Sequence, residues 1–166
     1  VKKIVQKGAG AGLIENPSHA GELVQAARQG ITSAAADIPL SVKTRLARTH
    51  IKTELWFRFL LQQNLDALTL HPRTPVQSYR DAVDWEQVAA LVRLRDQLQS
   101  DCQLRTCIIG NGDIYSLEAG THLARSTGMD GIMIGRGILS NPYIFSEHTP
   151  PLTDHPPTHK IHLALE

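Results

Sequence analysis

Two patterns of apolar residues alternate along this chain. In the first, apolar residues recur about every three or four positions, as on the buried face of a helix, and in the second they form short unbroken runs, as in a buried strand. The helical pattern occurs at 16–30, 54–63, 84–98, 116–126 and briefly near 141, and the strand pattern at 39–43, 66–71, 105–110 and 131–135. Because the strands are rich in Val, Ile and Leu and alternate with helices, the sequence predicts parallel strands covered by helices.

Residues that favour helix ends mark the boundaries of these helices. Asn16 and Pro17 suit the start of the first helix, and Thr53 and Asp84 are candidate caps of the next two. Gly128 suits the end of the fourth. The sequence thus predicts an α/β fold rather than an all-α or all-β one.

Composition limits the class of protein. The 166 residues are 42% hydrophobic and 20% charged with a net charge of +1, an ordinary globular composition without the long apolar run of a membrane span. The start of the chain lacks the apolar core of a signal peptide and an initiator Met, so we expect a piece of a longer protein. Cys102 and Cys107 form neither a disulfide framework nor a zinc pattern, which favours a reducing, cytoplasmic setting.

Two segments differ from the rest of the chain in charge or in composition. Between positions 41 and 80, seven Lys or Arg residues stand against two acidic residues, which gives this segment a charge of +5 and favours a phosphate-rich partner. Residues 149–166 are rich in Pro and His and are interpreted as a linker that leads into a truncated segment. Metal binding by the histidines of this tail is not expected, because a proline pair interrupts any helix that would align them.

Polar or glycine-containing motifs follow all four predicted strands. Each alone could be a solvated strand end or a plain turn, but in a parallel α/β barrel the C-terminal strand ends form the active-site face. The glycine-rich turns after the last two strands would let backbone N–H groups approach a phosphate closely, and Arg136 adds charge. The sequence therefore predicts a phosphate-bearing ligand near Val42-Lys43-Thr44-Arg45, Leu70-His71-Pro72-Arg73-Thr74, Gly110-Asn111-Gly112-Asp113-Ile114 and Gly135-Arg136-Gly137.

This ordered set of motifs resembles the tRNA-dihydrouridine synthases. The resemblance covers 1–145 and includes, besides the strand ends, Lys2 to Leu13, Gln77, Tyr79, Asp84-Trp85, Met133-Ile134 and Asn141-Pro142. It implies a TIM (β/α)8 barrel of which 1–148 supply roughly the second half, about strands 5 to 8, with 149–166 leading into a small helical domain. It also implies an FMN-dependent oxidoreductase that reduces specific tRNA uridines to 5,6-dihydrouridine, with NADPH as reductant.

The resemblance further implies roles for single residues. Lys43 and His71 would contact the flavin ring, where a cation stabilises the negative charge that accumulates on reduction. The FMN phosphate would be held by Asn111, Gly112, Asp113, Gly135 and Arg136. The tRNA would be contacted by Arg45, Arg73 and Tyr79.

The family's catalytic acid is a cysteine in a Gly-Cys-Pro motif that we expect upstream of Val1. Neither Cys102 nor Cys107 matches that motif, and Cys107 lies within an apolar strand as a small core residue. We therefore expect the isolated chain to be catalytically inactive. A half barrel also leaves strand edges unpaired, which favours self-association.

Two other functions stay open at the level of sequence. The chain could belong to another phosphate-binding barrel flavoenzyme that acts on a small molecule, or it could be a non-catalytic RNA-binding half barrel. The glycines of 8–12 do not have the spacing of a dinucleotide-binding fingerprint, and we interpret them as a flexible loop near the substrate.

Overall fold

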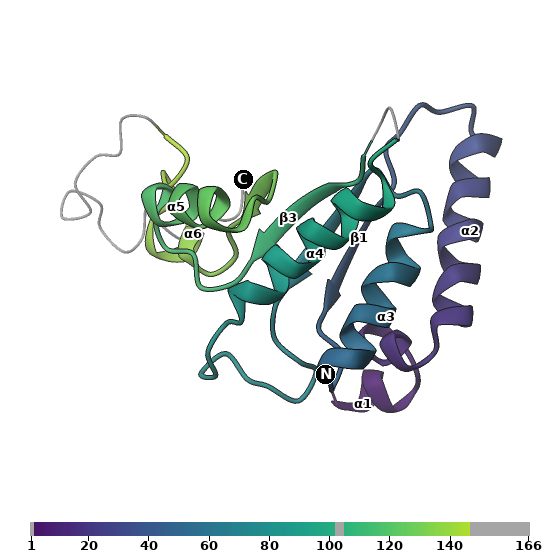
Figure 1. Ribbon diagram of the computed structural model, residues 1–166, viewed down its shortest axis with the longest axis horizontal. Helices are drawn as coiled ribbons and strands as arrows, with labels where there is room; N and C mark the ends of the chain where they lie inside the picture. The colour runs from purple at the N-terminus through teal and green to yellow at the C-terminus, as the bar shows by residue number, and fades with distance from the viewer. Residues whose placement is uncertain (1, 102–104, 147–166) are drawn as a thin grey trace.

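The computed structural model describes residues 2–101 and 105–146, so the segment 149–166 and Cys102 lie outside the described residues. Each strand is followed by a helix, and together they form an α/β structure (Figure 1). The elements are α1 (Lys2–Gln6), η1 (Gly10–Glu15), α2 (Pro17–Ser33), β1 (Ser41–Arg45), α3 (His50–Leu61), β2 (Ala67–His71), α4 (Trp85–Leu98), β3 (Cys107–Asn111), α5 (Leu117–Thr127), β4 (Gly131–Met133) and α6 (Gly137–Ser140).

The strands form one sheet in the order β1-β2-β3-β4, and all neighbours are parallel. This confirms the predicted α/β class with parallel strands. Such a sheet, with a helix after every strand, is consistent with half of a closed (β/α)8 barrel. No helix in the described part of the chain is long and apolar enough to cross a membrane.

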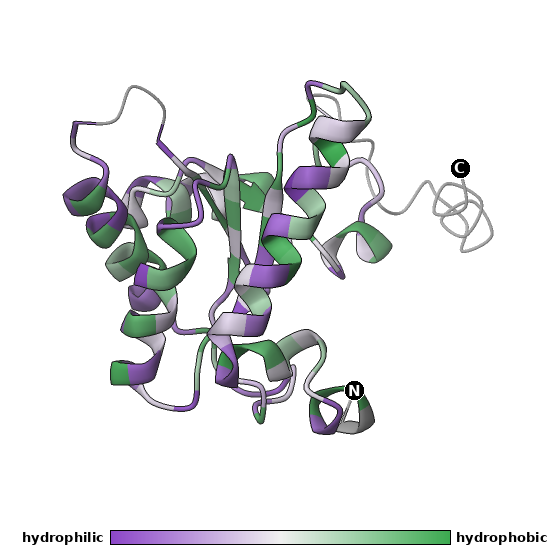
Figure 2. Ribbon diagram, turned by 90° about the vertical axis from the view of Figure 1, so that its right-hand side faces the viewer, coloured by the Kyte–Doolittle hydropathy of each residue, from purple (hydrophilic) through white to green (hydrophobic). Residues whose placement is uncertain are grey.

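Alternate strand residues build the core on one face of the sheet. Leu68, Leu70 and Ile108 are fully buried and belong to one apolar cluster with residues of α3 and α4. In Figure 1 these two helices run alongside the strands, with α2 outside α3. Along each helix, Figure 2 shows apolar and polar residues interspersed, as expected where one side packs and the other meets water.

A buried hydrogen bond fixes which way β1 faces. The indole Nε1 of Trp56, in α3, donates to Oγ1 of Thr44 at 2.9 Å. Thr44 therefore faces the helices, and the period of two along a strand sends Lys43 and Arg45 to the opposite face. We call that opposite face, which carries Lys43, Thr69 and Ile109, the open face of the sheet.

Helix boundaries differ from the prediction mainly at α3. The helix begins one turn earlier than expected, and its cap is Thr49, whose side chain accepts from the N–H of Lys52 at 3.3 Å. Thr53 is instead buried and accepts from the N–H of Ala47 at 3.0 Å. The prediction of Thr53 as the cap is wrong because two threonines one turn apart both suit a cap, and only tertiary packing separates them.

The other helix ends follow the sequence signals more closely. Asn16 accepts from the N–H of His19 at 3.2 Å, and Ser116 accepts from that of Ala119 at 3.1 Å. Gly128 ends α5 in the left-handed conformation with φ 76°, as predicted. Asp84 stands before α4, but its side chain makes no capping bond.

The glycines near the N-terminus do not form a plain loop. Gly8 lies in a turn, but Gly10 and Gly12 lie in the short helix η1, so the interpretation of 8–12 as a loop is wrong for 10–12. A Cβ at position 12 would lie 2.7 Å from the carbonyl oxygen of Val5, and the glycine therefore allows η1 to pack closely on α1. Hydrophobic periodicity alone does not register so short a 3-10 helix.

Candidate active site at the strand ends

Three polar side chains lie side by side across the open face at the C-terminal ends of β1, β2 and β3. Arg45 pairs in register with His71, and Asn111 is the residue after the last paired position of β3 with β2. β1 ends two residues and β3 one residue beyond the predicted limits, whereas β2 ends at His71 as predicted and β4 ends two residues short. The later end of β1 places Lys43 one layer below this row, opposite Thr69. We call Arg45, His71 and Asn111 the polar row.

Four ionisable side chains converge at the C-terminal ends of β1 and β2, namely Lys43, Arg45, His71 and Arg73. Burial, followed by the nearby Arg45, lowers the pKa of Lys43. Burial, followed by the charge of Arg73, lowers the pKa of Arg45. Positive charge is therefore concentrated at this corner of the open face, where an anionic group would be stabilised.

His71 is neutral in this environment. Burial, then the charges of Arg45, Lys43 and Arg73, lower its pKa to about 4. Its Nε2 lies 3.2 Å from Nη1 of Arg73, and because a guanidinium only donates, this nitrogen of His71 must accept. The remaining proton of the ring is then on Nδ1, which makes that nitrogen a hydrogen-bond donor.

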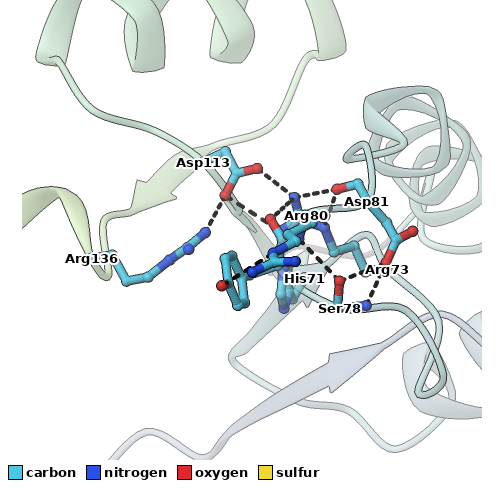
Figure 3. A network of polar contacts seen from close by, with 8 residues as sticks. His71, Arg73, Ser78, Arg80, Asp81, Asp113 and Arg136 are labelled. Carbon is cyan, nitrogen blue, oxygen red and sulfur yellow. Dashed lines mark hydrogen bonds and ion pairs between the residues drawn. The ribbon is translucent and has the colours of Figure 1, made fainter.

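Arg73 is the most buried charged residue at the site, with an exposed fraction of 1%. Its Nε donates to the carbonyl oxygen of Asp81 at 2.8 Å, and its Nη2 donates to that of Tyr79 at 3.3 Å. Both terminal nitrogens also contact the carboxylate of Asp113 (Figure 3). This position does not support the predicted contact of Arg73 with tRNA, because every one of these bonds is internal and the side chain is closed off from solvent.

Asp113 joins two arginines from different strand ends. Besides its ion pair with Arg73, its Oδ1 accepts from Nη2 of Arg136 at 2.6 Å. The hydrogen bond from Arg73, aided by the charge of Arg136, lowers the pKa of Asp113. The carboxylate is therefore ionised at neutral pH and holds the turns after β3 and β4 together (Figure 3).

Close backbone approach shapes the same two turns. Gly112 has φ 148° and Asp113 has φ 45°, conformations that favour glycine or aspartate. A Cβ at Gly137 would lie 2.5 Å from the carbonyl oxygen of Ile114, so only glycine lets these turns touch. The side chain of Asn111 adds a bond, donating to the carbonyl oxygen of Met133 at 2.8 Å.

A small pocket of about 160 Å³ opens between these turns. Its size is below the several hundred Å³ (roughly 300 or more) of a typical whole-ligand site, so it suits one end of a ligand. Arg136 and the glycine-rich backbone give it a donor set that fits a phosphate group. Its lining includes His71, Asn111, Gly112, Asp113, Gly135 and Arg136, which brings together six of the seven predicted cofactor-binding residues.

Lys43 and Arg45 lie instead beside a second, larger hollow. An apolar groove of about 470 Å³ runs between α2 and β1, an outer strand of the described sheet. Leu23 and Val24 of α2 line one side, and Val42 of β1 lines the other. The polar row thus lies between an apolar groove and a polar pocket.

The ring of Tyr79 contacts the guanidinium groups of two arginines. The Cζ atoms of Arg80 and Arg136 lie 5.6 and 5.2 Å from the ring centre, within the range of cation–π attraction. Tyr79 is 61% exposed and was predicted to contact tRNA, a role that its exposure allows. Its contact with Arg136 was not predicted, because the two residues are far apart in sequence and no motif relates them.

Cys107 has the environment of an unreactive thiol. It is half-buried at the start of β3, and burial, followed by the charge of Asp130, raises the pKa of its thiol. A raised pKa disfavours the reactive thiolate. The prediction that Cys107 is a core residue is wrong, because Cys107 lies on the face of β3 opposite to the buried Ile108. Among the residues that the structure describes, no group of three or more His, Cys, Asp or Glu could hold a metal ion.

Comparison with known proteins gives a consistent result. The model of the dihydrouridine synthase (Dus) family matches residues 1–162. A probable tRNA-dihydrouridine synthase 2 from Bacillus subtilis is 38% identical over 148 residues, which are 89% of this chain and 42% of the relative. A probable tRNA-dihydrouridine synthase from Staphylococcus aureus is 36% identical over 154 residues, 90% of this chain and 44% of the relative. The chain therefore spans less than half the length of the curated relatives it matches.

Proposed function

Because this chain belongs to the dihydrouridine synthase family, we propose that it forms part of an FMN-dependent tRNA-dihydrouridine synthase. The whole enzyme would reduce specific tRNA uridines to 5,6-dihydrouridine, with NADPH as reductant, in the cytoplasm. The observation that carries this proposal is the convergence of the polar row with the pocket beside Arg136 at the C-terminal strand ends. In a TIM barrel this is the face where catalytic groups gather.

The four strands correspond, in this proposal, to about strands 5 to 8 of the barrel. The groove between α2 and β1 supports that placement. In a barrel of alternating strands and helices, α2 would follow an earlier strand, and that strand would pair with β1 at the groove. Its apolar lining suits a strand that is buried on both faces.

The residues of the pocket would hold the FMN phosphate. Arg136 supplies the positive charge, while the glycine-rich backbone at Gly112 and Gly135 lets donors come close. Asn111 and Asp113 keep the turns in place through their bonds to Met133 and Arg136. Bound flavin supplies hydride chemistry, for which the protein provides binding and electrostatics.

Lys43 and His71 would face the flavin ring. Lys43 lies on the open face, where its ammonium form would stabilise negative charge on a reduced ring. His71 is held as a neutral donor through Nδ1 by its contact with Arg73. The site would thus combine one charged and one neutral donor at the edge of the ring.

The tRNA would approach from the side of the loop 74–84. Tyr79 and Arg80 are exposed there, and the basic character of residues 41–80 provides attraction for the RNA backbone. Arg45 would have a mixed role, because its Nη1 already donates to the carbonyl oxygens of Thr74 and Gln77 at 3.1 and 3.2 Å. It therefore shapes the loop as well as adding charge.

The isolated chain is expected not to reduce tRNA by itself. Cys107 lies at the start of β3, at the opposite end of that strand from Asn111, and its thiol pKa is raised. A general acid for uracil would have to be supplied by the rest of the protein. Self-association through β1 and β4, the outer strands of the described sheet, would be a further consequence of a half barrel.

Binding of FMN to the purified 166-residue chain tests this proposal. Titration followed by flavin fluorescence is expected to show saturable binding, weakened about tenfold or more by Arg136→Ala. Arg125→Ala removes the same charge from the last turn of α5 and should change the affinity less than about twofold. Absence of FMN binding by the unmodified chain would overturn the proposal.

Filter binding with tRNA separates the alternative functions. Saturable, salt-dependent tRNA binding together with FMN binding supports the synthase. Binding of tRNA without FMN would indicate a non-catalytic RNA-binding half barrel. Binding of FMN without tRNA at low salt would indicate a flavoenzyme that acts on a small molecule.

A further inference from the structure

A chain of contacts leads from the interior of the protein to Arg136. The buried guanidinium of Arg73 binds the carboxylate of Asp113, and the same carboxylate binds Arg136. The ring of Tyr79 lies 5.2 Å from Cζ of Arg136. Arg136 is thus held on two sides, by a charge and by an aromatic ring.

The inner end of this chain is rigidly fixed. Arg73 directs its Nε and Nη2 at the carbonyl oxygen of Asp81, at 2.8 and 2.5 Å. With the bond to the carbonyl oxygen of Tyr79, these contacts tie the loop after β2 to the side chain that also holds Asp113. A guanidinium has donors in a planar fork that can serve all these acceptors at once, which an ammonium group cannot.

The outer end retains donors for a ligand. The side chain of Arg136 is 49% exposed, and a free arginine of that exposure would sample many rotamers. Among the described residues, its one hydrogen-bonded nitrogen is Nη2, which binds Asp113. Its Nε and Nη1 therefore stay available for an anion in the adjoining pocket.

We propose that Arg73 and Tyr79 are positioning residues that aim Arg136 at the phosphate of FMN, Arg73 acting through Asp113 and Tyr79 through its ring. This inference rests on the proposed function, since it assumes that the pocket receives that phosphate. It replaces the predicted tRNA contact of Arg73 by a role that its burial permits. It also gives Tyr79 a role within the cofactor site.

Comparison of FMN with riboflavin isolates the phosphate. The two flavins share the ring and ribityl chain, so the ratio of their dissociation constants reports on the phosphate end alone. A variant that merely loosens the fold weakens both flavins together and leaves the ratio unchanged. Both ligands are titrated into the 166-residue chain by flavin fluorescence.

Arg73→Lys keeps the charge but cannot serve all the acceptors of the fork. It is expected to weaken FMN about tenfold relative to riboflavin, equivalent to about 1.4 kcal/mol. Arg95→Lys is the matched control, because Arg95 is also buried and is paired with Asp130, away from the pocket. It should lower the stability without changing the ratio.

Tyr79→Leu and Tyr79→Phe test the ring in the same assay. Leucine removes the aromatic face and should weaken FMN about threefold relative to riboflavin, whereas phenylalanine keeps the face and should leave the ratio unchanged. Unchanged ratios for both Arg73→Lys and Tyr79→Leu, with FMN still bound by the unmodified chain, overturn this inference alone. If the unmodified chain binds no FMN, the proposed function fails and this inference fails with it.

Discussion

Arg73 at the end of β2 and Asp113 after β3 form an ion pair in which the arginine side chain is 1% exposed and the carboxylate is 33% exposed. The pair joins the turn after β3 to the loop after β2, which also approach each other where a Cβ at Gly112 would lie 3.2 Å from the side chain of Val83. Breaking a buried pair by removing one partner is costly, because the remaining polar groups lose their bonds.

Arg73→Met is expected to reduce the free energy of unfolding by about 2 to 3 kcal/mol. The loss has two sources: Asp113 keeps its bond to Arg136 but loses the buried one to Arg73, and the carbonyl oxygens of Tyr79 and Asp81 lose their donor. Arg93→Met serves as the control, since the side chain of Arg93 is 61% exposed and surface pairs contribute little. Urea unfolding measures both, and equal costs for the two variants would show that the buried pair has no special weight.

The stability of the chain is expected to fall as the pH decreases from about 6.5 to about 4. The pKa of His71 is lowered to about 4 in the folded protein and is about 6.5 in an unfolded chain, so the unfolded state binds more protons in this window. The free energy of unfolding therefore rises with pH across it. Urea unfolding at pH 7 and pH 5 provides the measurement.

His71→Asn removes the titrating group and should flatten this dependence, whereas His122→Asn on α5 should not. If the free energy of unfolding of His71→Asn depends on pH as steeply as that of the unmodified chain, His71 is not the group responsible. The loss of stability attributable to Asp113 occurs at lower pH, since its pKa lies below the usual value for a carboxyl.

Gly137→Ala is expected to destabilise the protein by about 1 to 3 kcal/mol, because the new Cβ would clash with backbone that cannot easily move. The nearest atom is the carbonyl oxygen of Ile114, at 2.5 Å from the Cβ position. Gly135→Ala is a control from the same motif, with no atom within 4 Å, and should change stability by less than about 0.5 kcal/mol. Thermal unfolding of the two variants tests this contrast, and a similar melting temperature for both would refute the close approach.

Thr44→Val is expected to cost about 1 to 2 kcal/mol, since it leaves the buried indole N–H of Trp56 without its acceptor. Thr69→Val makes the same exchange on β2, where the hydroxyl has no hydrogen-bond partner among the described residues, and should be close to neutral. The indole N–H resonance of Trp56 in proton NMR should shift for the first variant and not for the second. An unshifted resonance in Thr44→Val would mean that the bond does not form in solution.

The regular elements could be predicted because their signals are local. Helices and strands follow apolar periodicity, and Asn16, Gly128 and the strand-end motifs are recognisable without knowledge of the fold. Parallel pairing then brings Arg45, His71 and Asn111 to one edge. The polar row is in this sense a consequence of the alternating elements.

The internal role of Arg73 could not be predicted in the same way. From sequence alone, an arginine after a strand is expected to lie at the surface. Arg73 is buried because the loop after β2 folds back and brings the carbonyl oxygens of Tyr79 and Asp81 to its guanidinium. The contact of Tyr79 with Arg136 likewise depends on two loops from different strand ends. Such contacts are set by tertiary structure and leave no periodic trace in the sequence.

Along β2, side chains alternate between the core and the open face, so the position of each residue decides whether it contributes to packing or to the site. Leu68 and Leu70 point into the core while Thr69 and His71 point to the open face, so the insertion of one residue in this strand would exchange the two sets. Such an insertion would bury an imidazole among leucines and present a leucine to the ligand. Insertions within β2 are therefore expected to be disruptive, whereas the connections between elements can change in length without exchanging the two faces.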